Sequence, residues 1–162
     1  MAAEQNPTPP PLSPYLTVDD AAAAIDFYAR AFGAEELMRQ TTPDGTKIIH
    51  AALRIHGSML MLSDDFPEMH EGRARTPKAL GGSSITLHLD LPDVDAEFER
   101  AVAAGASVIM PLENQFWGDR YGKLRDPFGH EWSLATRKRE VTQDALDHGS
   151  EKHFGATHGK RS

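Results

Sequence analysis

Apolar and polar positions follow two different periods along the first half of the chain. Alternation with period two predicts four short strands, over residues 12–18, 35–42, 47–55 and 59–63. Residues 21–32 instead carry apolar side chains at helical spacing, between an N-capping Asp20 and a terminating Gly33. The predicted order is therefore strand, helix, strand, strand, strand.

The same order recurs in the second half. A helix is predicted over residues 94–104, and strands over 84–91, 106–112, 120–125 and 131–137. The N-cap recurs at positions 20 and 93, the helix-ending glycine at 33 and 105, and a hairpin glycine at 57 and 129, so the offset is 72 or 73 residues. Three matched features at one offset indicate a duplicated βαβββ module. We therefore predict an α+β fold in which each module forms a four-stranded sheet with its helix on one face.

The segments outside the modules are predicted to be connections. Residues 1–11 contain four prolines, which predicts an extended, disordered lead-in. Module one then covers 12–63, a polar linker 64–82, and module two 83–137. Residues 138–162 are rich in Gly, His, Ser and charged side chains, which predicts a mostly disordered polar tail.

Composition narrows the classes of partner. The chain has no Cys, which excludes disulfides, thiolate zinc sites and Cys nucleophiles. Seventeen Lys and Arg against 24 Asp and Glu give a formal net charge of −7 with no basic block, so nucleic acid and anionic membranes are disfavoured. The first residues lack the basic start and apolar run of a secretory signal, and no apolar stretch approaches the roughly 20 residues that span a bilayer. We expect a cytoplasmic protein.

Four sequence segments carry a resemblance to a known family. They are YLTVDD at 15–20, DFY at 26–28, FWGDRYG at 116–122 and DPFGHEW at 126–132. Together with the duplicated βαβββ pattern over residues 12–137, they resemble the vicinal-oxygen-chelate superfamily. This superfamily includes glyoxalase I, extradiol dioxygenases and the bleomycin-resistance proteins. The resemblance implies two modules whose mixed sheets curl around a shared cavity, often completed by a second chain, and we expect a homodimer.

The resemblance also implies where a metal would bind. In metal-using members, four ligands, usually His, Gln or Glu, come from the first and last strands of each module. The corresponding positions here are Ser13, Met61, Thr86 and Ser133. They offer neither a carboxylate nor an imidazole, which such ions prefer. We therefore expect no metal at these positions and no cofactor.

Other side chains on the predicted strands could do chemistry. Alternation places His50 on the polar face of its strand, His88 on the polar face of the first strand of module two, and Glu131 on that of the last. The three are candidates for proton transfer or ligand binding. A relocated metal site built from them, and purely structural roles, remain alternatives.

The segment 116–122 is the richest in candidate binding groups. The resemblance places it at the mouth of the cavity, where Trp117 would stack on a planar ligand and Arg120 would bind an anionic group. Tyr121 would orient the ligand, while Thr86, Met61 and Ser133 would form an uncharged floor. The alternative is that Trp117 packs over the sheet edge and Arg120 pairs with a surface carboxylate.

Two functions follow from these candidates. The first is a non-catalytic module that binds a small molecule, sequestering an aromatic or amphipathic compound as drug-resistance proteins do. The alternative is a glyoxalase-like lyase or isomerase that uses His50, His88 or Glu131 for proton transfer, or a relocated metal. Whether the protein is an enzyme stays open at this point.

Overall fold

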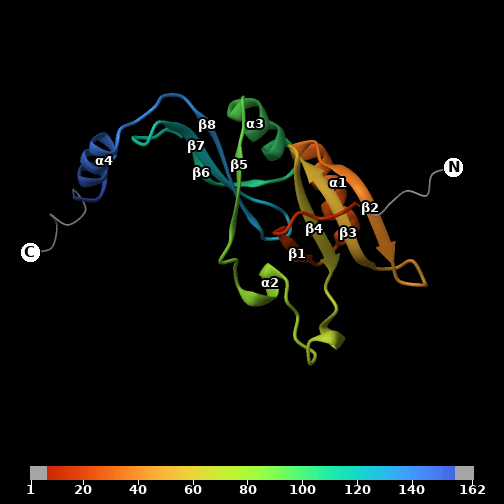
Figure 1. Cartoon of the computed structure of the whole chain (residues 1–162). Coiled ribbons are helices and arrows are strands. Elements are labelled where there is room, and N and C mark those ends of the chain that lie inside the picture. Colours follow the sequence, from red (N-terminus) through yellow and green to blue (C-terminus); the bar gives the residue numbers. More distant parts are fainter. Residues whose placement is uncertain (1–6, 156–162) are drawn as a thin grey trace, which may run out of the picture.

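The computed structural model describes residues 7–155, which form two four-stranded sheets with helices (Figure 1). Sheet one has the order β1-β4-β3-β2, with β1 parallel to β4 and the other pairs antiparallel. Its elements are β1 (Tyr15–Val18), α1 (Ala21–Phe32), β2 (Glu35–Thr41), β3 (Ile48–Ile55) and β4 (Ser58–Asp64).

Sheet two repeats this topology with the order β5-β8-β7-β6. Its elements are β5 (Thr86–Asp90), α3 (Val94–Ala104), β6 (Ser107–Asn114), β7 (Asp119–Arg125) and β8 (Glu131–Arg137). The short helices η1 (Pro67–Met69) and α2 (Pro77–Leu80) lie in the linker. The predicted α+β fold with a duplicated βαβββ module is confirmed.

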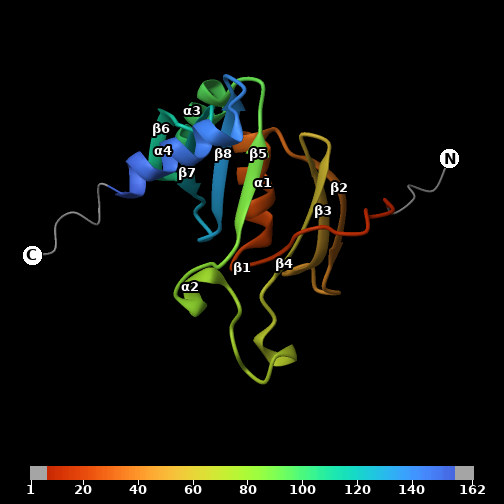
Figure 2. The same ribbon diagram turned by 60° about the vertical axis from the view of Figure 1, so that its left-hand side comes forward.

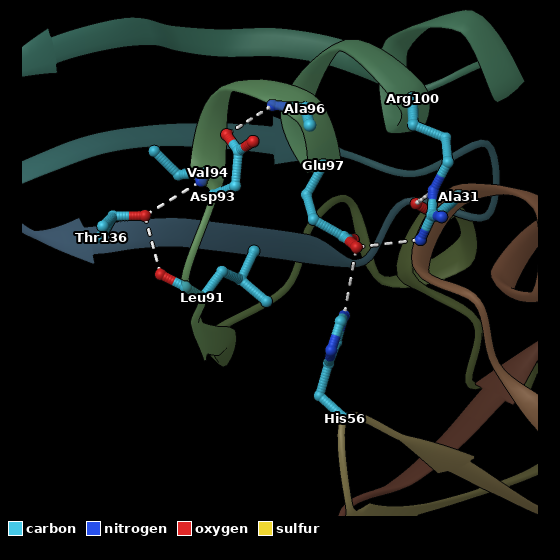
Figure 3. Close-up of polar contacts among 9 residues, drawn as sticks. All are labelled: Ala31, His56, Leu91, Asp93, Val94, Ala96, Glu97, Arg100 and Thr136. Carbon is cyan, nitrogen blue, oxygen red and sulfur yellow. Dashed lines mark hydrogen bonds and ion pairs between the residues drawn. The ribbon is translucent and has the colours of Figure 1, made fainter.

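Both module helices begin and end at the residues that the sequence indicates. Asp20 Oδ1 accepts a hydrogen bond from Ala23 N at 2.9 Å, and Asp93 Oδ1 accepts one from Ala96 N at 3.2 Å (Figure 3). Gly33 ends α1 with φ 64°, a conformation that glycine adopts without steric cost. These caps satisfy backbone donors that a helix start leaves unpaired, so they fix where each helix begins.

Three differences from the predicted elements change which residues are paired or helical, while other strand ends shift by one or two residues. β1 begins at Tyr15 rather than Leu12, whose side chain is exposed, and β5 begins at Thr86, leaving Ile85 exposed. The third difference lies in the predicted polar tail, where α4 spans Gln143–Gly155 without a buried residue. A helix can form there because its residues tolerate helical geometry although they supply no core-facing stripe. Residues 1–6 and 156–162, which include parts of the predicted lead-in and tail, lie outside the described residues.

Helix α1 packs on more than its own sheet. Its buried residues surround much of the helix: Ala21, Ala24, Ile25, Phe27, Tyr28, Ala31 and Phe32. The rings of Phe32 and Tyr28 lie 4.6 and 5.4 Å from that of Trp132 on β8, and α1 also contacts α3. Figure 2 shows α1 between the two sheets. The face of each sheet that carries no helix is consequently left uncovered.

A buried carboxylate joins the modules at this junction. Asp126 Oδ2 accepts hydrogen bonds from Tyr28 OH at 2.6 Å and from Trp132 Nε1 at 2.9 Å. Its Oδ1 accepts from the backbone N–H groups of Phe128 and His130. Burial, followed by the charge of Asp126, raises the pKa of Tyr28 well above its ordinary value. The Asp-Pro-Phe-Gly turn therefore fixes module two to α1 as well as reversing the chain.

A second polar contact between the modules lies at the tip of the β3–β4 hairpin. Glu97 Oε1 on α3 accepts a hydrogen bond from Arg100 at 2.9 Å, and His56 Nε2 lies 3.4 Å away (Figure 3). Arg100 also donates to the carbonyl of Ala31 on α1 at 3.0 Å. Together with the buried junction, these contacts fix the orientation of the two modules relative to each other.

Candidate functional site

The uncovered face of sheet two carries most of the predicted site residues; we call it the module-two open face. Alternation along β5 places Thr86 and His88 on this face, and the register sets them opposite Glu131 and Ser133 of β8. Tyr121 of β7 lies on the same face, whereas the next residue, Gly122, faces α3, where an added Cβ would come within 2.7 Å of Phe98. The structure thus brings these residues together from three adjacent strands.

His88 is held between two polar partners on this face. Its Nδ1 lies 2.7 Å from Ser133 Oγ, and its Nε2 lies 3.3 Å from Asp90 Oδ1. Ser133 is buried, but 43% of the His88 side chain is exposed. The imidazole is therefore oriented by the protein while one side of it remains accessible to a ligand.

Glu131 lies between two cations. Lys123 Nζ donates to its Oε2 at 3.2 Å, and Arg125 Nη2 donates to its Oε1 at 2.9 Å. These hydrogen bonds, that from Arg125 first and that from Lys123 next, lower the pKa of Glu131. A carboxylate stabilised in its charged form is a weaker general base than a free one, so this geometry favours a charge-balancing role for Glu131.

Aromatic rings extend the site from His88 towards the β6–β7 loop. The His88 and Tyr121 rings are stacked with centroids 6.3 Å apart. Tyr121 meets Trp117 edge-to-face at 5.6 Å, and Trp117 meets Phe116 in the same way at 5.1 Å. We call these four residues the ring row. Its rings contact one another in sequence, at steep angles between Tyr121, Trp117 and Phe116, and the exposed part of such a ring can stack on a planar molecule.

A cavity formed by the described residues adjoins this face at the free edge of β5. Its volume is about 790 Å³, within the range of small-molecule sites. Thr86 and His88 line it on one side, and Arg54 and Met59 of sheet one on another. Most of the remaining wall is apolar: Pro7, Pro9, Pro10, Leu12, Pro14, Leu37, Ile55, Leu60, Leu87, Leu89 and Trp132. His88 therefore belongs to both the cavity and the ring row.

Arg120 does not join the other predicted ligand-binding residues. Its guanidinium donates to both carboxylate oxygens of Asp95 on α3, at 2.8–3.0 Å, on the helix-covered face of sheet two. Adjacent strand residues point to opposite faces, so Arg120 and Tyr121 cannot both contact one ligand on the open face. Arg120 thus forms an ion pair between β7 and α3, as in the alternative in which it pairs with a surface carboxylate.

Two predicted residues, His50 and Met61, lie on sheet one. His50 Nδ1 is 3.0 Å from Tyr15 OH, and their rings are stacked at 5.5 Å. Met61 is the register partner of Tyr15. Because α1 separates the two sheets, these residues belong to a different face from His88 and Glu131 within one chain (Figure 2).

Sequence reasoning missed two residues of this arrangement, Tyr15, which partners His50, and Lys123, which balances Glu131. Strand alternation does place Asp90, the second partner of His88, on the same face as His88. Alternation could also have found Lys123, which lies two residues from Tyr121 along β7. The pairing of Tyr15 with His50, 35 residues apart in sequence, requires the order of the strands in sheet one.

The four positions that correspond to the metal ligands of vicinal-oxygen-chelate proteins do not carry side chains that suit such a metal ion. Ser13, Met61, Thr86 and Ser133 supply hydroxyl and thioether groups, and Ser133 Oγ is already bonded to His88. The first two residues lie in module one and the last two in module two. Among residues 7–155, no group of three or more His, Asp or Glu is placed to bind a metal ion.

Comparison with known proteins identifies the superfamily of the chain and several similar proteins. The family model of the Glyoxalase/Bleomycin resistance protein/Dioxygenase superfamily matches residues 12–134, and the chain belongs to this superfamily. The uncharacterized protein Mb0911c of Mycobacterium bovis is 58% identical over 137 residues, which are 85% of this chain and 90% of that protein. Protein YjdN of Escherichia coli is 33% identical over 156 residues, covering 82% of this chain and 99% of YjdN.

A solved structure agrees with the fold. The crystal structure of TioX from Micromonospora sp. ML1 superposes with a TM-score of 0.60 at 31% identity, covering 78% of this chain and 97% of TioX. The resemblance that the sequence motifs indicate is thus confirmed. In the part of the chain that the structure describes, no helix is long and apolar enough to cross a bilayer.

Proposed function

We propose that the protein binds a flat, largely apolar small molecule with one anionic or hydrogen-bonding end at the module-two open face. The observation that carries this proposal is the shared position of His88, which lines the cavity and also stacks on Tyr121 of the ring row. A ligand in contact with His88 would therefore reach apolar walls on one side and aromatic rings on the other.

The chemistry of the face matches such a ligand. Apolar cavity walls and ring faces contribute the burial that drives binding, while a few fixed polar groups orient the molecule. Thr86 and His88 provide hydrogen-bonding groups, and the group of Lys123, Arg125 and Glu131 carries a net positive charge that would favour an anionic end. These contacts need no chemical reaction. We therefore propose that the protein sequesters an aromatic or amphipathic compound by binding it.

The test is calorimetric titration with 2-naphthoate, a planar aromatic carboxylate. Trp117→Ala should weaken binding by roughly 30-fold, the effect of losing about 2 kcal/mol at a binding hot spot. Met69→Ala is the matched control because Met69 is large, apolar and exposed but lies in the linker. Failure of the wild type to bind would contradict the proposed ligand class. Equal affinity of wild type and Trp117→Ala would place the site away from the ring row.

A second candidate function is favoured by the contacts of His88. An imidazole held at Nδ1 by Ser133 and at Nε2 by Asp90 is oriented for proton transfer. An isomerase acting on an α-hydroxycarbonyl compound would transfer the carbon-bound proton to His88, giving an enediol, and return it to the former carbonyl carbon, while the hydroxyl proton passes to the former carbonyl oxygen. Of the other two candidates, Glu131 is paired with cations and His50 lies on sheet one.

Proton transfer is measurable without knowing the substrate. Dihydroxyacetone dissolved in D₂O exchanges carbon-bound hydrogen for deuterium when a base enolises it, and proton NMR reports the loss. If this candidate is correct, the wild type accelerates exchange and His88→Gln does not. If exchange with the wild type is no faster than in buffer alone, proton transfer by His88 is contradicted and the binding function remains.

We also propose that the protein forms a homodimer in which the open face of module one covers the module-two open face of a second copy. α1 separates the two faces within one chain, and exposed apolar side chains lie on them, including Tyr15 on β1 and Met110, the register partner of Lys123. Light scattering at micromolar concentration should give twice the chain mass. A monomer under these conditions would reject this assembly.

A further inference from the structure

Helix α4 stands at the tip of the β6–β7 hairpin, apart from the cores of the two modules (Figure 1). It has no buried residue. Its contacts include two with the loop that carries Trp117, made by Gly149 and His153.

The chain leaving β8 first crosses this loop. The backbone N–H groups of Lys138 and Arg139 both donate to the carbonyl of Gly118, at 2.9 and 3.2 Å. The Arg139 guanidinium donates to the carbonyl of Phe116 at 3.2 Å. Gly118 has φ 99°, and a Cβ there would come within 2.8 Å of Val141 Cγ2 and would collide with the Arg139 carbonyl. A side chain at this position would thus prevent the crossing.

Helix α4 then contacts the loop through a second glycine. A Cβ on Gly149 would lie 2.5 Å from Cδ2 of Phe116 and 2.9 Å from its Cγ. One turn further along α4, the His153 ring lies 5.8 Å from the Phe116 ring. Glycine weakens a helix interior, but at this position it leaves the space that the phenyl ring fills.

The contact reaches the proposed ligand site through two rings. Phe116 packs edge-to-face on Trp117, and Trp117 packs edge-to-face on Tyr121 of the module-two open face. A shift of Phe116 away from α4 would move the indole that completes the ring row. Because α4 buries no residue, its docking belongs to the weakest part of the structure and is readily reversible.

We infer that α4 is a positioning element that holds Trp117 in its ligand-binding orientation, so that docking of α4 and binding of a planar ligand reinforce each other. This inference rests on the proposed function for the part that concerns the ligand. Coupling between two such events is reciprocal: a docked α4 raises ligand affinity, and bound ligand stabilises the docked helix.

The decisive variant is Gly149→Ala in the full chain. Alanine is a better helix former than glycine, so α4 itself is stabilised while its contact with Phe116 is blocked. Gly155→Ala is the matched control, because it makes the same change on α4 where a Cβ would meet no atom within 4 Å. Both proteins carry 5-fluorotryptophan, whose two fluorine resonances report separately on Trp117 and on the buried Trp132.

The inference predicts that Gly149→Ala moves or broadens the Trp117 resonance, leaves that of Trp132 in place, and weakens 2-naphthoate binding about fivefold or more. Gly155→Ala should match the wild type in all three readouts. An unchanged Trp117 resonance in Gly149→Ala would overturn the inference whatever the ligand does. A changed resonance with unchanged affinity would overturn the coupling alone. The Trp117→Ala titration then tells whether the binding site itself has been wrongly placed.

Discussion

The two tryptophans of the chain occupy regions of opposite character. Trp132 lies at the junction of the modules, 2% exposed, with its Nε1 bonded to Asp126 and its ring against Phe32. Trp117 lies half-buried beyond the sheet, between Phe116 and Tyr121. The first indole packs in the core and only borders the cavity at the edge of β5, whereas the second leaves more of its surface available.

The polar groups of the two regions differ in the same way. At the junction, both oxygens of Asp126 accept hydrogen bonds from buried donors. On the module-two open face, His88 has two partners but stays 43% exposed, and Asp90 is 80% exposed. A fully satisfied, enclosed network contributes to stability, while a partly exposed one retains the capacity to bind.

The two open faces offer a related contrast. Module one pairs Tyr15 on its first strand with His50 on its third, and module two pairs His88 on its first strand with Tyr121 on its third. The register shows that these positions correspond, because Tyr15 lies opposite Met61 as His88 lies opposite Ser133. The duplicated modules thus keep a Tyr–His ring pair but exchange its two members. Only in module two does a serine, Ser133, lie opposite the first-strand ring, and it contacts His88.

The largest expected effect separates the two tryptophans. Trp132→Ala should lower the free energy of unfolding by about 3–5 kcal/mol, since it empties a core position and removes one of the donors to the buried Asp126 carboxylate. Trp117→Ala should lower it by less than about 1 kcal/mol, because a half-buried loop residue lacks these features. Urea denaturation of both variants measures the difference. Equal losses would remove the distinction between the junction and the open face.

A matched pair of tyrosines sharpens the comparison. Tyr28→Phe removes a buried hydroxyl that donates to a charged carboxylate, and should cost about 1.5–3 kcal/mol of unfolding free energy. Tyr15→Phe removes an exposed hydroxyl on sheet one and should cost less than about 0.5 kcal/mol. The same denaturation experiment applies. A Tyr28→Phe protein as stable as the wild type would show that the Asp126 network does not secure α1.

The smallest effect concerns pH and the cation-paired Glu131. Its pKa is lowered in the folded protein by Arg125 and then Lys123, so its stabilising contribution is present above its ordinary pKa of 4.5 and is lost as pH falls below that value. At pH 7, Glu131→Gln should be less stable than the wild type by under about 1 kcal/mol, as for exposed ion pairs. Denaturation at pH 7, 5 and 3 should show this gap closing. A gap that is constant with pH would contradict the ion-pair account.

Much of the fold follows from local sequence signals. The caps Asp20 and Asp93 and the ending glycines Gly33 and Gly105 set both module helices, because they act through bonds within a few residues. The packing of the two modules against each other could not be predicted from such local signals. The contact of Tyr28 with Asp126 spans 98 residues, and no local pattern reveals that α1 contacts both sheets.

The site was predicted in part for the same reason. Strand alternation correctly put His88, Ser133 and Glu131 on one face, and the same rule, if applied to residues 120 and 121, would have separated Arg120 from Tyr121. The helix α4 was missed because its sequence has no apolar stripe. Its contact with the Trp117 loop depends on a glycine meeting a ring, which becomes visible only in three dimensions.

A planar ligand should bind the module-two open face and leave the junction of the modules undisturbed. Backbone amide shifts of the ¹⁵N-labelled protein, followed during titration with 2-naphthoate, test it most directly. We expect the amide resonances of His88, Trp117 and Tyr121 to shift and those of Tyr28 and Phe32 to stay in place. Shifts confined to other regions, or no shifts at millimolar ligand, would contradict it.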